Sequence, residues 1–240
     1  MKIKNVVYKL KEIYRKLSVP QFTIVTGLII IFFGTLILSS PLCSSSDVGL
    51  WEAFFTSTSA ITVTGLTIID VGVDLNIFGQ IFLALMLLSG GLGLMAITTF
   101  LQGFVVKGTQ LRTRLDKGKT LDEFGVGGIG RTFQSIAITA TSIISFGAIV
   151  LYFFGFLEIQ NNWQRLWSAI FHSISAYNNA GFSLWSNSLQ DYRSNFVVNI
   201  VFIFLIVMGG LGWRVIDDIW SNRKNLSYKK LSLHSRLVIR

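Results

Sequence analysis

A stretch rich in hydroxyl side chains, TSTSAITVTGL at residues 56–66, carries the groups in this sequence that are best suited to bind an ion. Its TVTGL end, at 62–66, contains a glycine, Gly65, whose conformational freedom permits backbone angles that a side chain would forbid. Backbone carbonyl oxygens that line a narrow path can replace the water around a dehydrated cation. The stretch therefore predicts a cation-binding loop made of backbone, with a simple polar turn between hydrophobic helices as the alternative.

A copy of this stretch lies 116 residues further along the chain. Seven of the 15 residues from Trp51 to Gly65 are identical to those from Trp167 to Gly181, and the glycine recurs at the same position. A second match follows at a shift of 119, where GGLG at 90–93 returns at 209–212. The exact recurrence disfavours the simple polar turn and indicates that the chain consists of two similar units.

Composition restricts the class of protein. Of 240 residues, 51% are hydrophobic and 14% are charged, and the mean hydropathy is +0.59, which is typical of a membrane protein rather than a soluble domain. One cysteine, Cys43, excludes an internal disulfide framework and a cysteine-rich metal site. No nucleophile–base set or pair of carboxylates lies in an apolar segment, so we do not expect an enzyme.

The elements that must position these loops are apolar helices. Four segments lack charged residues and are long enough to cross a bilayer: Leu17–Ser46, Leu75–Val106, Thr132–Leu157 and Ser194–Trp213. LWEAFFTSTSAI (50–61) and LWSAIFHSISAY (166–177) are only about half a bilayer long as helices. We therefore expect an all-α membrane protein with two parallel helix–pore-loop–helix repeats, comprising four transmembrane helices and two re-entrant half-helices.

The basic residues predict the orientation in the membrane. Of the 21 Lys and Arg residues, 19 lie in segments 1–18, 107–131 and 214–240, which flank the spans. This distribution is typical of cytoplasmic loops and argues against nucleic acid as the partner of a chain with net charge +9. We expect a multi-pass plasma-membrane protein with both termini in the cytoplasm and its units at 19–106 and 132–213. Residues 41–75 then face outside, with four acidic residues and no basic one.

The motifs STSAITVTGL, HSISAYNNAGF and SGGLG, in this order of helix, pore loop and helix, resemble the Trk/Ktr/HKT superfamily of potassium transporters. The chain looks most like the membrane subunit of the Ktr system. The resemblance implies a filter glycine in each unit, here Gly65 and Gly181, and potassium as the transported substrate, and it leaves open whether sodium takes part. It also implies which carbonyl groups form the filter: those of Thr62, Val63, Thr64, Gly65, Asn178, Asn179, Ala180 and Gly181.

The family has four such units around one pore, whereas this chain has two. Residues 214–240 end in a segment that resembles the lead-in to a third unit, so we expect the chain to be a fragment. The partners expected are the lipid bilayer, another copy or a complementary half-chain, and no nucleic acid. The resemblance also implies a cytoplasmic nucleotide-binding regulatory subunit that docks on 107–131 and 214–240. The alternative function is a non-conducting half-subunit that assembles with pore-forming chains; no cofactor is expected.

Three further features allow more than one interpretation. GVGGIG at 125–130 has the spacing of a dinucleotide-binding loop, but no acid follows between Glu123 and Glu158, so a helix entry is favoured. His172 lies in the second half-helix, where packing is favoured over metal binding. The GGLG pairs are either hinges or close-packing sites, and packing is again favoured.

Overall fold

The computed structural model describes residues 19–91, 126–212, 215–216, 218–219 and 232–239. Within these ranges all regular structure is helical, and the one β-bridge is an isolated contact between Ser44 and Leu75. This agrees with the predicted all-α class. The basic segments 1–18 and 107–125 lie outside the described residues, so the predicted side of the membrane for each of them stays a prediction.

Two groups of helices follow one another along the chain. The first contains α2 (Val19–Leu38), α3 (Leu50–Thr62), the single turn α4 (Val71–Asp74) and α5 (Ile77–Gly91). The second contains α7 (Val126–Val150), the π-helix η1 (Leu151–Gly155), α8 (Asn162–Tyr177), the 3-10 turn η2 (Gln190–Tyr192) and α9 (Phe196–Leu211). A short helix, α11 (Leu233–Ile239), comes last.

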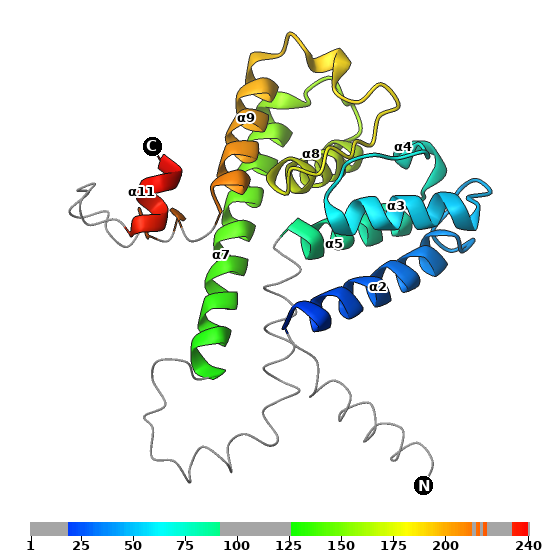
Figure 1. Cartoon of the computed structure of the whole chain (residues 1–240). Helices are drawn as coiled ribbons and strands as arrows, with labels where there is room; N and C mark the ends of the chain where they lie inside the picture. The colour runs from blue at the N-terminus through cyan, green and yellow to red at the C-terminus, as the bar shows by residue number, and fades with distance from the viewer. Residues whose placement is uncertain (1–18, 92–125, 213–214, 217, 220–231, 240) are drawn as a thin grey trace, which may run out of the picture.

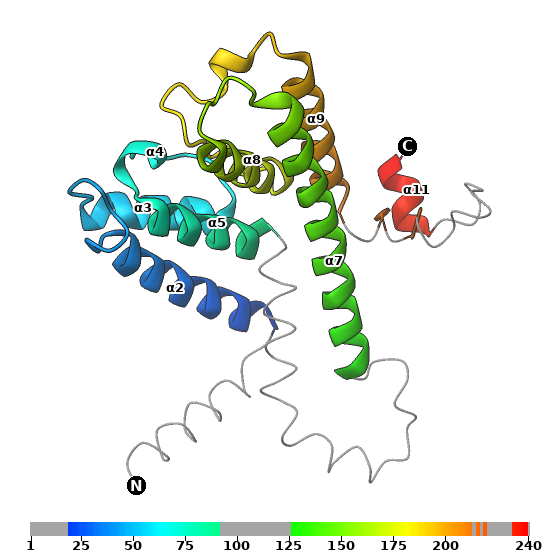
Figure 2. The ribbon, with the colours of Figure 1, turned by 180° about the vertical axis from the view of Figure 1, so that it is seen from behind.

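Figure 1 shows α2, α3 and α5 gathered on one side and α7 with α9 on the other, and α8 lies between the two groups. Seen from behind in Figure 2, the axes of α2 and α5 again run across those of α7 and α9. α8 packs against α7 and α9 of its own group and against α5 of the first. The second short helix therefore joins the two groups.

The helix boundaries follow the predicted spans only in part: α9 lies within two residues of its predicted span at both ends, whereas α2 ends eight residues before Ser46 and α7 begins six residues before Thr132. α8 begins at Asn162, earlier than the predicted start at residue 166, because the side chain of Asn161 accepts hydrogen bonds from Trp163 N (2.9 Å) and Gln164 N (3.2 Å). α7 begins at Val126, so most of GVGGIG is the first turn of a helix. This start of α7 agrees with the helix-entry interpretation.

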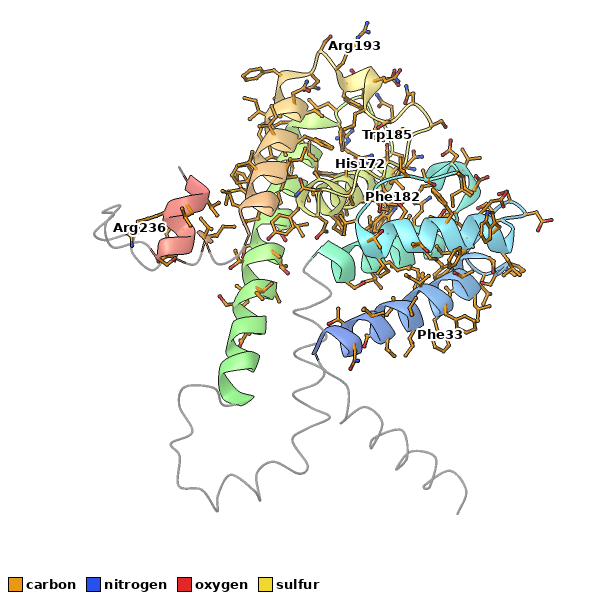
Figure 3. The ribbon with its side chains drawn as sticks, viewed as in Figure 1. Phe33, His172, Phe182, Trp185, Arg193 and Arg236 are labelled. Carbon is orange, nitrogen blue, oxygen red and sulfur yellow. The ribbon has the colours of Figure 1, made fainter. Side chains whose placement is uncertain are left out.

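The helices are apolar on exposed as well as buried faces. The helical stretch Gln134–Gly155 is long and apolar enough to cross a membrane, while Thr23–Leu38, Ile77–Gly91 and Phe196–Leu211 are apolar but shorter, among the residues described. On α2, Leu28 and Phe33 are more than half exposed, and Figure 3 shows Phe33 on the side away from the other helices. Such a surface suits lipid rather than water.

The first glycine of each GGLG pair lies against the end of a short helix. A Cβ atom on Gly90 of α5 would be 2.5 Å from the carbonyl oxygen of Ile61, and one on Gly209 of α9 would collide with that of Tyr177. Ile61 and Tyr177 are equivalent under the 116-residue shift. These contacts favour the packing role over the hinge, because only a residue without a side chain lets α5 and α9 approach so closely.

We predict that Gly209→Ala destabilises the chain by about 1–3 kcal/mol, since the added methyl group would overlap backbone that cannot move aside. Gly210→Ala is the matched control: its Cβ would meet only Asn179 Nδ2, at 3.9 Å. Thermal unfolding in detergent, followed by tryptophan fluorescence, should show a lower midpoint for Gly209→Ala and an unchanged or slightly higher one for Gly210→Ala. Equal midpoints for the two variants would contradict the close contact.

Candidate ion-binding site

The short helices α3 and α8 end with the same pair of backbone hydrogen bonds. Thr64 N donates to Ser59 O (2.9 Å), and Ala180 N donates to Ser175 O (2.8 Å). The accompanying bonds to Ala60 O and Ala176 O complete the Schellman pattern in both units. Both bonded pairs are related by the 116-residue shift, so the two copies of the sequence end their helices with the same backbone geometry.

Each of these two helix ends needs a residue in the left-handed conformation. In neither loop is that residue a glycine. Val63 has φ 55° and Asn179 has φ 56°. Asparagine adopts this conformation fairly readily, but a β-branched residue such as valine rarely does, at a cost of about 1–3 kcal/mol. Two residues later, Gly65 (φ 82°) and Gly181 (φ 73°) also have positive φ. Each loop therefore reverses its backbone twice within three residues.

The two loops meet at their glycines. A Cβ atom on Gly65 would collide with the carbonyl oxygen of Ala180 and would lie 3.6 Å from the Cα atom of Gly181. One on Gly181 would lie 3.7 Å from the Cα atom of Gly65. Segments more than a hundred residues apart thus come into direct backbone contact, and the predicted site residues of both units share one place in the fold.

The carbonyl groups of both loops are left without hydrogen bonds. Among the described residues, no donor bonds to the backbone oxygens of 62–65 or 178–181. More than nine in ten buried backbone carbonyl groups in proteins are paired, yet Ala180 is fully buried and its oxygen is not. A group of adjacent unpaired carbonyl oxygens is chemically suited to hold a cation that has shed its water.

The polar side chains of the loops turn back to their own helices. Thr62 Oγ1 donates to Thr58 O (2.8 Å) and bonds with Thr64 Oγ1 (2.6 Å). Asn178 is buried, and its Nδ2 donates to Ile174 O (2.8 Å). These side-chain nitrogen and hydroxyl groups are thus engaged locally, whereas Asn178 Oδ1 is buried without a hydrogen-bond partner. The oxygens that the loops leave unpaired are therefore those of the backbone and this side-chain amide.

In the second unit, α8 also holds the chain beyond the glycine. Ser175 Oγ donates to Phe182 O (2.7 Å), and His172 Nε2 lies 3.1 Å from Ser183 Oγ and 3.4 Å from Leu184 N. His172 and Ser175 are three residues apart and share one face of the helix. Figure 3 shows His172, Phe182 and Trp185 close together at this place. We call these contacts to residues 182–184 the α8 clamp.

The hydrogen bonds of His172 define its tautomer. Nδ1 lies 2.8 Å from the carbonyl oxygen of Ser168, which can only accept, so Nδ1 carries the proton. Nε2 then accepts from the hydroxyl of Ser183 and the amide of Leu184. The ring is almost fully buried and stacks on Trp185 at 4.1 Å. Packing, the interpretation favoured from sequence, is confirmed, but the sequence did not indicate that the ring would hold the loop.

The first unit has no such clamp. The residues equivalent to His172 and Ser175 are Thr56 and Ser59, whose hydroxyl groups are buried without a hydrogen-bond partner. The segment after Gly65 is correspondingly open, with Leu66 and Ile68 more than half exposed. The two loops therefore share the turn that presents their carbonyl groups and differ in how firmly the chain beyond it is held.

An aromatic cluster supports the outer part of the second unit. Phe156, at the end of η1, packs edge-on against Trp185 at 5.1 Å, and Tyr192 of η2 lies 5.0 Å from each of them. Burial raises the pKa of Tyr192, and the negative charges of Glu158 and Asp191 raise it further. Tyr192 is therefore an uncharged packing residue, and the cluster anchors the connection between Gly181 and α9.

The acidic residues predicted to face outside have structural roles as well. Asp74 accepts hydrogen bonds from Ser46 Oγ (2.7 Å) and Asp70 N (2.8 Å). Asp70 caps α4 through Gly72 N (3.1 Å), and Glu52 accepts from Gly49 N at the start of α3. No group of three or more residues that could bind a metal ion through His, Cys, Asp or Glu occurs in the part of the chain that the structure describes.

We predict that His172→Phe frees the segment after Gly181, because the ring is kept while both of its bonds to Ser183 and Leu184 are lost. Losing a buried partner costs about 1–3 kcal/mol, so amide exchange at Leu184 should quicken about tenfold or more. Hydrogen-exchange mass spectrometry of peptides covering 182–187 measures this. Thr56→Val is the matched control, since the hydroxyl of Thr56 has no partner; unchanged protection in His172→Phe would contradict the clamp.

Comparison with known proteins connects this geometry to a family. Residues 34–238 match the family model TrkH, described as a cation transport protein. The chain is 33% identical over 221 residues to the Ktr system potassium uptake protein B of Bacillus subtilis, and 31% identical over 222 residues to its namesake of Vibrio alginolyticus. It is 32% identical over 232 residues to the potassium/sodium uptake protein NtpJ of Enterococcus hirae.

These alignments cover 92%, 92% and 95% of this chain but 48%, 48% and 50% of the respective relatives. The chain thus spans about half the length of the curated relatives it matches. The family and these relatives are transporters rather than enzymes, in agreement with the sequence. The match extends over most of the chain and includes both loops, and it shows that the chain belongs to the TrkH family of cation transport proteins.

Proposed function

We propose that the chain is part of a membrane subunit for potassium uptake, and that its backbone at 62–65 and 178–181 lines the ion path. One observation carries the proposal. Two loops with the same backbone geometry meet at Gly65 and Gly181, and their carbonyl groups have no hydrogen-bond partner among the described residues. Oxygen atoms in this state are what a dehydrated cation requires.

The helices that lead into the loops support the same function. α3 and α8 direct their C-terminal ends, where the helix dipole is negative, toward the loops, which favours a cation there. The names of the two Ktr relatives point to potassium, and the name of the Enterococcus relative adds sodium. We therefore propose potassium as the principal substrate and sodium as a second ion.

The remaining parts of the assembly are also proposals. We propose a plasma-membrane location with both termini in the cytoplasm, and a cytoplasmic nucleotide-binding subunit on the basic segments 107–131 and 214–240, most of which lies outside the described residues. Two loops form half of a closed ring around an ion, so a complete path requires two more loops, from another copy or from a complementary half-chain.

Replacement of the loop glycines tests the site. In a chimera that joins this chain to the C-terminal half of the Bacillus relative, Gly65→Ala and Gly181→Ala should each lower the preference for potassium over sodium about tenfold, equivalent to about 1.4 kcal/mol. A side chain at positive φ displaces the carbonyl groups. Uptake of both ions by a potassium-uptake-deficient bacterium is the measurement, with Gly210→Ala as control.

Unaltered selectivity in both loop variants would count decisively against the proposed ion path. If the unaltered chimera reaches the membrane and carries neither ion, the non-conducting half-subunit becomes the better account. The 240-residue chain is also expressed alone in the same strain. Ion uptake by these cells shows whether the chain conducts without a complementary half.

Labelling with an impermeant maleimide in intact cells tests the orientation. Cys43 is buried, so we choose Asp47→Cys as the external reporter, and Lys117→Cys and Asn225→Cys as the internal ones, all in a Cys43→Ala background. Asp47→Cys should react in intact cells, and the other two only after permeabilisation, since the basic clusters stay in the cytoplasm. Reaction at position 117 in intact cells would show the orientation to be wrong.

A further inference from the structure

The segment that follows the first loop has the same internal turn as its clamped counterpart in the second unit. Ile69 N donates to Thr67 Oγ1 (3.2 Å), as Trp185 N donates to Ser183 Oγ (3.1 Å). The 116-residue shift relates the two turns, because it carries Thr67 onto Ser183. The turn of the first unit is therefore already formed, and we call residues 66–69 the strap.

The backbone that leads to the strap also matches the second unit. Val63 and Asn179 have φ of 55° and 56°, and Gly65 and Gly181 have φ of 82° and 73°. The helices before them end with equivalent hydrogen bonds. The two units thus follow the same path as far as the glycine and differ in the contacts that the chain makes after it.

A serine at the end of each short helix shows this difference. Ser59 of α3 corresponds to Ser175 of α8, whose hydroxyl donates to Phe182 O (2.7 Å) in the α8 clamp. The equivalent acceptor in the first unit is Leu66 O, yet Ser59 Oγ is buried and has no hydrogen-bond partner among the described residues. A buried hydroxyl without a partner destabilises the conformation in which it occurs. Ser59 therefore favours a second conformation, in which the strap reaches its hydroxyl.

Only this one bond of the α8 clamp is available to the first unit. His172 reaches Ser183 and Leu184 through the far nitrogen of its ring. Its counterpart is Thr56, whose hydroxyl is attached directly to Cβ and is too short to span the same distance. One hydrogen bond shifts an equilibrium by about tenfold, equivalent to about 1.4 kcal/mol. The strap is therefore held weakly enough to populate both conformations, whereas three contacts hold the clamped segment.

We infer that the strap moves between the conformation in this structure and a docked one, in which Ser59 Oγ donates to Leu66 O. Docking fixes the residue next to Gly65 and undocking frees it, so the strap controls how firmly the Gly65 carbonyl group is held. The first loop is then the adjustable side of the ion path, and the second loop is its fixed side. Docking follows from the contacts within the chain alone, while its effect on uptake rests on the proposed function.

A fluorine label on the strap tests for the two conformations. Ile68 is more than half exposed, so Ile68→Cys in a Cys43→Ala background can carry a trifluoromethyl group. Fluorine NMR of the purified chain should show a docked and an undocked signal, or their average if exchange is fast. Ser59→Ala removes the donor, so the ratio of docked to undocked chains should fall about tenfold. Ser57→Ala is the matched control, because the hydroxyl of Ser57 is also buried and unpartnered but lies beside Gly34 of α2.

Grafting the missing ring tests the opposite change. Thr56→His gives the first unit the histidine of the second, so amide exchange over residues 66–70 should slow about tenfold. Thr56→Phe is the control, since it adds a ring without nitrogen. Thr56 is fully buried, so the unfolding midpoint is measured for both variants. If the added ring lowers it, His172→Thr replaces the graft and should make residues 182–187 exchange as fast as 66–70.

Three results would overturn the inference. The first is a fluorine signal that Ser59→Ala leaves as unchanged as Ser57→Ala does. The second is an unaltered exchange rate of the strap in Thr56→His when that variant keeps the wild-type unfolding midpoint. The third, where the reciprocal change is used, is wild-type protection of residues 182–187 in His172→Thr.

Uptake by the chimera with the C-terminal half of the Bacillus relative tests the effect on the ion path separately. Ser59→Ala should change the preference for potassium over sodium about threefold or more, and Ser57→Ala should leave it unaltered. No change in Ser59→Ala, with a clear change in Gly65→Ala, would refute control by the strap and leave the ion path standing. Two strap conformations without any effect of Gly65→Ala on selectivity would refute the ion path and leave the strap standing.

Discussion

Most of the structure around the site serves to keep a few backbone carbonyl groups without hydrogen bonds. The loops at 62–65 and 178–181 achieve this by stopping a helix with a left-handed residue and reversing again at a glycine. α5 and α9 can approach the helix ends because Gly90 and Gly209 have no side chain. Ala180 is fully buried and its carbonyl oxygen is unpaired, whereas buried carbonyl groups are nearly always paired. This oxygen supports the proposal that the loops bind a ligand.

The two copies of the loop have diverged in their support. In the second unit, the α8 clamp and the cluster around Trp185 hold the chain beyond Gly181. In the first unit, the equivalent Thr56 and Ser59 make no such bonds. If the two loops line one ion path, the second is firmly held and the first is less constrained. A change in loop conformation would then be confined to the segment after Gly65.

The sequence predicts the parts of this account that depend on local chemistry. Runs of apolar residues locate the helices, and the exact repeat places Gly65 and Gly181 in equivalent positions before any contact is known. It does not predict that His172 holds Leu184 or that Trp167 meets Gln80, because those pairings depend on how distant segments pack. The sequence could also have predicted that Asn161 caps α8, since asparagine often precedes a helix. It could not have predicted the left-handed conformation of Val63, because β-branched residues rarely adopt it.

The central claim is that the carbonyl groups of both loops bind the transported ion. The most direct test is the anomalous diffraction of rubidium, a heavier substitute for potassium, in crystals of the assembled transporter that contains this chain. The account predicts an anomalous peak within coordinating distance of the backbone oxygens of 62–65 and 178–181, which weakens when sodium replaces rubidium. Rubidium bound only elsewhere, with both loops ordered and their carbonyl groups turned into hydrogen bonds, would contradict it.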